Sequence, residues 1–194
     1  MNPLIGVLAL QGAFAAHAES LTRVGARVAE VRTPEHLGGV DALVMPGGES
    51  STMSNLLVSS GLFDPIAARI NDGMAVFGTC AGMILLASEI LDGRDDQRNF
   101  AAIDISVRRN AFGRQVDSFE TDIPTSVGNF HGVFIRAPRI ERVGGSVEVL
   151  GSVGGEPVLV RNERVMAASF HPELAGDDRL HDYFVSTVLS GKEG

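Results

Sequence analysis

The sequence predicts an α/β fold: an open, mostly parallel sheet in three layers, with helices on both faces and added antiparallel strands. Two observations carry this prediction. In the first half of the chain, short apolar runs, typical of strands buried on both faces, alternate four times with helix-forming segments. In the second half, short β segments separated by turns replace that alternation. The first pattern favours parallel βαβ units, and the second favours antiparallel strands that extend or flank the sheet.

The elements of the first half follow from the apolar runs and the turn residues between them. Strands are predicted over residues 4–10, 27–31 and 41–45, and from residue 75 to the turn at 78–82. Helices are predicted from the turn at 11–12 to near residue 25, from 50 or 51 toward 60, over 64–71 and over 81–91. Ser50 or Ser51 is expected to cap the second of these helices.

After residue 91 the sequence pattern changes, and short β segments replace the alternation of strands and helices. Residues 92–98 form a polar loop whose charges are expected to be solvated rather than functional. A helix over residues 177–189 is expected to close the chain. Between the loop and that helix, the predicted β segments are residues 103–108, 115–121, 132–135, 147–153, 157–161 and 165–168.

Length and composition limit the classes of protein that the chain can belong to. Its 194 residues, 44% of them hydrophobic, suit one compact domain, and we expect that domain to span residues 1–194. The net charge of -8 argues against nucleic acid or an anionic membrane as a partner. A single cysteine cannot form an intramolecular disulfide, and the N-terminal residues have no signal-peptide pattern, so we expect a cytoplasmic protein.

The only cysteine lies at a tight turn between a predicted strand and a predicted helix. The pattern is Gly78-x-Cys80-x-Gly82, the cysteine form of a nucleophile elbow. Strand and helix nearly touch beside such a turn, so a Cβ at either glycine position would clash. The sulfur projects at the N-terminal end of a helix, where free N–H groups favour the thiolate. A lone cysteine is more often a small buried hydrophobe, but the glycines and the strand-to-helix change favour catalysis here.

A thiolate nucleophile needs a partner that moves protons, and His171-Pro172-Glu173 follows the strand predicted over 165–168. Residues two apart in an extended segment point to the same side, so Glu173 can orient His171. In an open α/β sheet the site lies at the carboxyl ends of the strands, where this segment, the Cys80 turn and the loop at 46–50 all fall. His-Pro-Glu taken alone is more often a plain turn. After a cysteine elbow it indicates a Cys80–His171–Glu173 triad.

Acyl chemistry also needs N–H donors for the oxyanion that develops on the attacked carbonyl. The backbone N–H of Ala81, which follows the nucleophile, is one candidate. The Gly47-Gly48 pair can supply a second, because glycine lets the backbone approach a ligand closely. The alternative for this pair is an ordinary strand-to-helix turn. It is not a phosphate-binding Walker loop, since no Gly-Lys-Ser/Thr follows.

The remaining histidines show no spacing typical of metal ligands, and we expect no metal site. His17, His36 and His181 are interpreted as surface or structural residues. His131 lies near the expected pocket, and the sequence identifies no partner for it.

These motifs together resemble those of the triad-type (class I) glutamine amidotransferase family, whose fold is flavodoxin-like. The shared motifs are Pro-Gly-Gly-Glu-Ser at 46–50, Gly-Thr-Cys-Ala-Gly at 78–82 and Phe-His-Pro-Glu at 170–173. Within that family, the chain is more similar to the glutaminase subunits of pyridoxal 5'-phosphate synthases. That closer resemblance extends over nearly the whole chain and includes the runs at 6–12, 109–120 and 132–138.

The resemblance implies that the chain hydrolyses L-glutamine to L-glutamate and ammonia through a thioester on Cys80, with no cofactor. The ammonia would pass through a tunnel to a synthase subunit, the expected partner in a hetero-oligomer that makes pyridoxal 5'-phosphate (vitamin B6). Oxyanion donors would be Gly48 and Ala81. An arginine is well shaped to bind a carboxylate, but the residues alone do not say which one does so. The implied substrate contacts are Gly48, Glu49, Ser50, Arg109, Ile135 and Arg136.

Three alternatives compete with this interpretation. The chain could be the glutaminase of another biosynthetic complex, such as imidazole glycerol phosphate synthase; the run at 109–115 argues against it. It could be a non-catalytic binding module on the same fold, against which the intact triad residues argue. It could be a cysteine-elbow stress protein or peptidase of similar fold, which the loop at 46–50 and the His-Pro-Glu segment disfavour. For Arg109, the alternative to a binding role is a solvated strand edge.

Overall fold

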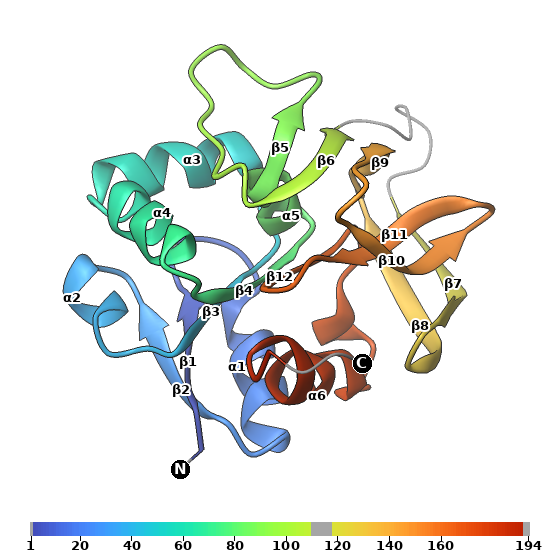
Figure 1. Ribbon diagram of the computed structural model, residues 1–194, viewed down its shortest axis with the longest axis horizontal. Coiled ribbons are helices and arrows are strands. Elements are labelled where there is room, and N and C mark those ends of the chain that lie inside the picture. The colour runs from blue at the N-terminus through green and yellow to red at the C-terminus, as the bar shows by residue number, and fades with distance from the viewer. Residues whose placement is uncertain (1, 110–117, 192–194) are drawn as a thin grey trace.

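A nine-stranded sheet forms the centre of the structure, a computed structural model that describes residues 2–109 and 118–191. Its strand order is β2-β1-β3-β4-β12-β11-β10-β7-β8 (Figure 1). The first five strands in this order are parallel, and every later neighbour is antiparallel. The predicted fold class, a mostly parallel sheet with added antiparallel strands, is therefore confirmed.

The parallel half consists of short strands joined through helices, as the alternating pattern predicts. Most predicted bounds hold to within a few residues. The strands are β1 (Leu4–Leu8), β2 (Arg27–Val31), β3 (Ala42–Met45), β4 (Ala75–Thr79) and the late strand β12 (Val165–Ala168). The helices are α1 (Phe14–Arg23), α2 (Pro34–Leu37), α3 (Ser50–Ser59) and α4 (Phe63–Asn71).

The antiparallel half is built from hairpins. Residues 115–117 of the strand predicted over 115–121 lie outside the described residues, and the described strand starts at Ser118. The strands are β7 (Ser118–Thr125), β8 (Gly128–Ile135), β10 (Glu148–Val153) and β11 (Glu156–Arg161). After β12 come a short 3-10 turn, η1 (Pro172–Leu174), the helix α6 (Arg179–Tyr183) and the π-helical turn η2 (Phe184–Val188).

The helix predicted over residues 81–91 is wrong in its second half. The helix α5 ends at Leu86, and β5 (Ala87–Ile90) follows at once. β5 pairs in parallel with β6 (Ile103–Arg108), which pairs with β9 (Arg139–Val143), a strand the sequence did not predict. The side chain of Asn99 donates to the carbonyl of Ala87 at 2.6 Å. Pairing with a distant strand thus overrides local helix propensity.

Two apolar layers lie on opposite faces of the large sheet. One includes Met53 of α3, Ile66 of α4 and Leu85 of α5, and continues under the small sheet β5-β6-β9. The other includes Leu21 of α1 and Phe184 after α6. Figure 1 shows α3, α4 and α5 on one side of the parallel strands and α1 and α6 on the other. Helices therefore cover both faces, as predicted.

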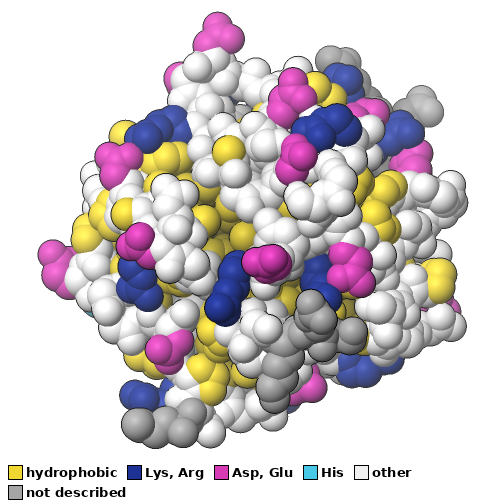
Figure 2. Space-filling model, in the orientation of Figure 1, with side chains coloured by type: hydrophobic (Ala, Val, Ile, Leu, Met, Phe, Trp, Pro, Cys, Tyr) yellow, Lys and Arg dark blue, Asp and Glu magenta, His cyan; other side chains and the backbone are white. Residues whose placement is uncertain are grey.

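On the face drawn in Figure 2, basic and acidic side chains are interspersed. Among residues 2–109 and 118–191, no helix is long and apolar enough to cross a membrane.

The two glycines of the cysteine turn are sterically required, as predicted. A Cβ added at Gly78 would lie 2.6 Å from the carbonyl carbon of Gly82, so strand β4 and helix α5 meet there. A Cβ at Gly82 would instead collide with the carbonyl oxygen of Met45, at the end of the neighbouring strand β3. A Cβ at Gly78 would also lie 2.5 Å from Cδ1 of Leu86, but at both glycines the clash includes backbone atoms, which cannot move away as a side chain can.

We expect Gly82→Ala to lower the free energy of unfolding by about 1–3 kcal/mol, because the added methyl overpacks against backbone. Gly39→Ala is the matched control, since a Cβ at Gly39 meets nothing within 4 Å. That variant should stay within about 0.5 kcal/mol of the parent. Urea unfolding of the three proteins measures the effect, and equal stability of the two variants would contradict the packing argument.

Candidate active site

Three loops meet at the carboxyl ends of three neighbouring strands. β3, β4 and β12 are adjacent and parallel in the sheet, so the loops that follow them emerge at one edge. The loop after β3 carries Gly47, the turn after β4 carries Cys80 and the loop after β12 carries His171. The backbone N–H of Cys80 donates to the carbonyl of Ala168 at 2.8 Å, which joins the second and third loops.

Cys80 lies in a strained backbone conformation at the top of the turn. Its φ is 51° and its ψ is -107°, a combination that a non-glycine residue rarely adopts. Such strain persists only where the surroundings hold it, and it concentrates at functional sites. The sulfur lies 3.9 Å from the carbonyl oxygen of Ile135, at the end of β8. Helix α5 starts at Ala81, so the Ala81 N–H is among the first amides, which have no acceptor within the helix.

His171 and Glu173 form a close buried pair beside this cysteine. Nδ1 of His171 lies 2.7 Å from Oε1 of Glu173, and both residues are buried. The backbone N–H of His171 donates to the carbonyl of Val133 in β8, which fixes the segment against the sheet. Burial lowers the pKa of His171, but hydrogen bonds to Cys80 and Glu173 and their negative charge outweigh it and raise the pKa to about 10. The imidazole is therefore a cation at neutral pH, between the Cys80 sulfur and the Glu173 carboxylate.

The Gly47-Gly48 segment lies directly against the imidazole. A Cβ added at Gly47 would lie 2.5 Å from Cε1 of His171 and 3.4 Å from Cβ of Cys80. The carbonyl of Gly47 packs on Gly12, where an added Cβ would collide with it. Because the peptide is trans, the N–H of Gly48 points away from the loop at 11–12. Oε1 of Gln11 accepts from the backbone N–H of Glu49 at 3.2 Å, so the two loops are joined.

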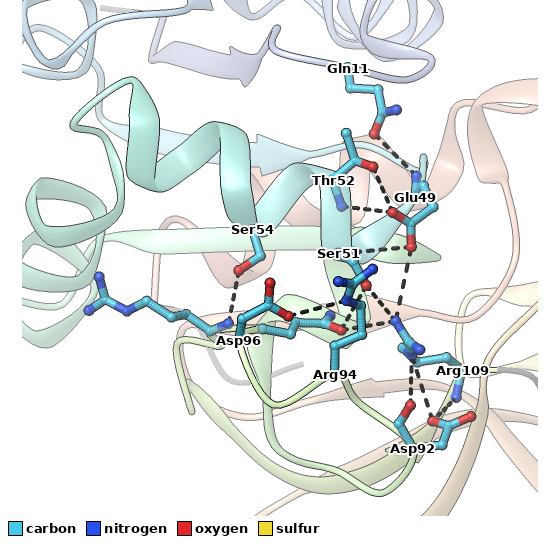
Figure 3. A network of polar contacts seen from close by, with 11 residues as sticks. Gln11, Glu49, Ser51, Thr52, Ser54, Asp92, Arg94, Asp96 and Arg109 are labelled. Carbon is cyan, nitrogen blue, oxygen red and sulfur yellow. Dashed lines mark hydrogen bonds and ion pairs between the residues drawn. The ribbon is translucent and has the colours of Figure 1, made fainter.

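The start of α3 differs from the prediction that Ser50 or Ser51 caps it. Glu49 is the N-cap residue, and its carboxylate accepts from the backbone N–H groups of Ser51 and Thr52 (Figure 3). Burial raises the pKa of Glu49, but the hydrogen bonds from Thr52 and Ser51 outweigh it and lower the pKa. Glu49 caps the helix in place of a serine because its negative charge also interacts favourably with the positive end of the helix. Ser50 itself is buried.

Arg109 is bound into the same network, and the loop at 92–98 is not merely solvated as predicted. The guanidinium donates to Oγ of Ser51 at 2.6 Å and to Oε1 of Gln97 at 3.0 Å. Asp92 accepts from the Arg109 backbone N–H at 2.7 Å, and its carbonyl accepts from the guanidinium. Figure 3 shows Asp92 and Glu49 on opposite sides of the Arg109 guanidinium. Arg109 is thus anchored, not a solvated strand edge.

The predicted substrate residues fall into two groups. One group surrounds the start of α3 and consists of Gly48, Glu49, Ser50 and Arg109. There, Nη1 of Arg109 lies 4.0 Å from Oε1 of Glu49. Ile135 ends β8, with its carbonyl oxygen 3.9 Å from the Cys80 sulfur, and Arg136 follows it in the chain. Arg136 has a positive φ of 45° and is exposed. Residues 110–117 of the run at 109–120 lie outside the described residues.

Histidines that the sequence interpretation set aside hold buried positions near the His171–Glu173 pair. His17 is fully buried, with its Nε2 3.3 Å from Oε2 of Glu173, and His181 is buried against it. The helical period of α1 places His17 on the same face as the buried Leu21, a signal that could have indicated its burial. His131 is exposed and pairs with Glu120 and Asp122; these two bonds raise its pKa.

Comparison with known proteins agrees with the geometry. The family described as the SNO glutamine amidotransferase family matches residues 7–190. The chain is similar to a protein of Mycobacteroides abscessus named pyridoxal 5'-phosphate synthase subunit PdxT, with 58% identity over 98% of this chain and 100% of the relative. A Salinispora arenicola protein of the same name is 57% identical over 96% of each chain. A crystal structure of a glutamine amidotransferase matches with a TM-score of 0.90 and 51% identity, over 96% of this chain and 98% of that one.

Proposed function

The chain belongs to the SNO glutamine amidotransferase family, and we propose that it hydrolyses L-glutamine and delivers the ammonia to a synthase subunit of pyridoxal 5'-phosphate synthase. The observation that carries the proposal is the strained Cys80 elbow beside the His171–Glu173 pair. The names of the two relatives support the synthase subunit as partner. We propose one glutamine amidotransferase domain over residues 1–194, acting in the cytoplasm, where a lone free cysteine stays reduced.

The first chemical step forms a thioester. The Cys80 thiolate attacks the side-chain amide carbon of glutamine, and the carbonyl oxygen becomes an oxyanion. The N–H groups of Gly48 and Ala81 stabilise that oxyanion. The His171 imidazolium then donates its proton to the departing nitrogen, the C–N bond breaks, and ammonia leaves. Glu173 accepts from Nδ1 of His171 and so keeps the proton to be transferred on Nε2.

The second step releases glutamate. His171, now neutral, takes a proton from water, and the hydroxide attacks the thioester carbon. The C–S bond breaks, glutamate leaves and the thiolate with its imidazolium partner is restored. Gly48, Glu49, Ser50, Arg109, Ile135 and Arg136 are the proposed substrate contacts. Arg109 and Arg136, one in each group of substrate residues, are the candidate partners of the glutamine α-carboxylate.

The partner is proposed to dock around the mouth of this site. Two apolar side chains there are exposed: Ile135, whose carbonyl faces the Cys80 sulfur, and Leu174, which follows Glu173. The loop at 11–12 contacts the Gly47-Gly48 segment directly: Gly12 packs on the Gly47 carbonyl, and Gln11 accepts from the backbone N–H of Glu49. A partner that moves the loop at 11–12 therefore acts on an oxyanion donor, and glycine can rotate between backbone states at small steric cost.

We expect slow ammonia release from the isolated chain and a rise of about 10- to 100-fold when the synthase subunit is added. A free glutaminase would waste glutamine, and ammonia released into water would be protonated before it could react. A steady-state assay of ammonia release across a titration of the partner measures the rise. Full activity without the partner would contradict the switch.

Gly48→Ala, assayed in parallel, tests where the switch lies. An added Cβ there would lie 3.1 Å from Oε1 of Gln11 and 3.2 Å from Sδ of Met53. The variant should therefore release ammonia more slowly than the parent when the partner is present. Gly39→Ala, whose Cβ meets nothing, is the control. If Gly48→Ala is stimulated as fully as the parent, the switch lies elsewhere.

A further inference from the structure

A chain of buried polar side chains continues from the triad into the protein interior. One carboxylate oxygen of Glu173, Oε1, is bound to His171. The other, Oε2, lies 3.3 Å from Nε2 of His17, and Nδ1 of His17 lies 2.9 Å from Nε2 of His181. His17 comes from α1 and His181 from α6, and neither is exposed to solvent. Burial of polar groups is costly unless they are paired, so this arrangement needs a reason.

Both of these histidines are neutral. Burial lowers the pKa of His17 to about 4, although the Glu173 carboxylate opposes the shift. Burial and the neighbouring His17 lower the pKa of His181 to about 3, against the attraction of Glu173 and Asp178. The other charges that act on them are the cations His171, near His17, and Arg23, near His181. A neutral imidazole carries one N–H and one lone pair, so the position of each proton decides what His17 presents to Glu173.

The pairing of the ring nitrogens settles the two tautomers. Nδ1 of His181 is buried and has no hydrogen-bond partner among the described residues. If Nδ1 carried the proton, a buried N–H would be unpaired, and the lone pair on Nε2 would have to accept from Nδ1 of His17. Nε2 of His17 would then turn a lone pair toward the Glu173 carboxylate. With both protons on Nε2, His181 donates to His17, and His17 presents an N–H to Glu173.

The hydroxyl of Thr79 completes this environment. Oγ1 of Thr79 lies 3.1 Å from Nε2 of His17 and is its well-aligned hydrogen-bond partner. Nε2 of His17 is also close enough to Oε2 of Glu173 for an ion pair, but the geometry is not that of a hydrogen bond. Among the described residues, Oε2 of Glu173 has no hydrogen-bond partner. The His17 N–H thus lies between the last residue of β4, which precedes the nucleophile, and the carboxylate that orients the base.

We propose that His17 is a positioning residue of this site: with its Nδ1 bound to His181 and its Nε2 to Thr79, its Nε2–H keeps Glu173 ionised and turned so that Oε1 stays on His171. The proposal rests on the triad roles proposed above. His17 touches no reacting atom and acts only through Glu173. Removing its N–H should weaken the carboxylate's support of the His171 cation, so that His171 loses its proton at lower pH.

The test compares two substitutions at His17 in the full chain with its synthase partner. His17→Leu removes the N–H and should lower kcat about 10- to 100-fold, as loss of a supporting hydrogen bond does elsewhere, with KM within about twofold of the parent. The alkaline limb of kcat/KM should also move to lower pH. His17→Gln keeps an N–H donor near the position of Nε2 and should recover most of both losses. Phe184→Leu, which trims a buried ring packed on Phe77, is the control for altered packing alone.

The proposal is overturned if His17→Leu keeps the parent's alkaline limb, or if His17→Gln is as impaired as His17→Leu. A second readout does not depend on activity. In protein with 15N-labelled histidine, His17 and His181 should both show a protonated Nε2 and a bare Nδ1 at pH 7, and a proton on Nδ1 of His17 would overturn the proposal. If the unaltered complex released no ammonia, the proposed function would fail, while the nitrogen shifts would still decide the role of His17.

Discussion

Replacing Cys80 by alanine is expected to lower glutamine hydrolysis by about 10⁴-fold or more, because every step of the proposed mechanism passes through its sulfur. Alanine keeps the β-carbon that packs near Gly47 and removes only the nucleophile. The fold and the binding of the synthase subunit should therefore be unchanged. Ammonia release at saturating glutamine and saturating partner measures the loss, and circular dichroism with a binding assay checks the rest.

Cys80→Ser makes a sharper companion to the alanine variant. It has nearly the same shape, but a hydroxyl is a much weaker acid and nucleophile than a thiol, so the variant should be almost as inactive. When the parent turns over glutamine labelled in its carbon skeleton, rapid acid quenching should trap the labelled γ-glutamyl group on the peptide that contains Cys80. Neither variant should trap any label. Substantial hydrolysis by Cys80→Ala would refute the thioester mechanism.

The parallel half of the fold was predictable from the sequence because its information is local. Strands such as β3 and β4 are buried on both faces, so their sequences are almost entirely apolar. The glycines of the Cys80 turn have steric reasons that depend on neighbours within a few residues or on the next strand. The order of loops at the sheet edge then follows from topology, which brings Cys80 and His171 together although they are far apart in the chain.

Other features depended on contacts that no local pattern encodes. Residues 87–90 resemble a continuing helix until the distant strand over residues 103–108 pairs with them. Glu49 replaces the expected serine as the cap of α3, because its carboxylate reaches two backbone N–H groups. Asp92 and Gln97 resemble ordinary loop residues and acquire a role only when folding brings Arg109 to them. His17 was set aside for the same reason, since its partners come from the far end of the chain.

His171→Asn and Glu173→Gln are expected to differ in severity and in pH dependence. Asparagine has no group that moves a proton in either step, so the loss should reach about 10⁴-fold or more. Glutamine at 173 still fills the site but no longer carries the charge, so its loss should be roughly tenfold smaller. Steady-state assays with saturating partner give both values. Equal, mild losses would show that a different base serves Cys80.

The pH dependence follows from the raised pKa of His171. In the folded chain this pKa is about 10, above the ordinary value of 6.5, because the bonds and charges of Cys80 and Glu173 outweigh burial. The stability that His171 contributes is therefore fully present below pH 6.5 and is lost as the pH rises through about 10. The gap in unfolding free energy between the parent and His171→Asn should narrow over that window. The alkaline limb of kcat/KM should lie near pH 10 in the parent and at lower pH in Glu173→Gln. An alkaline limb that stays in place in Glu173→Gln would mean that Glu173 does not support the His171 cation.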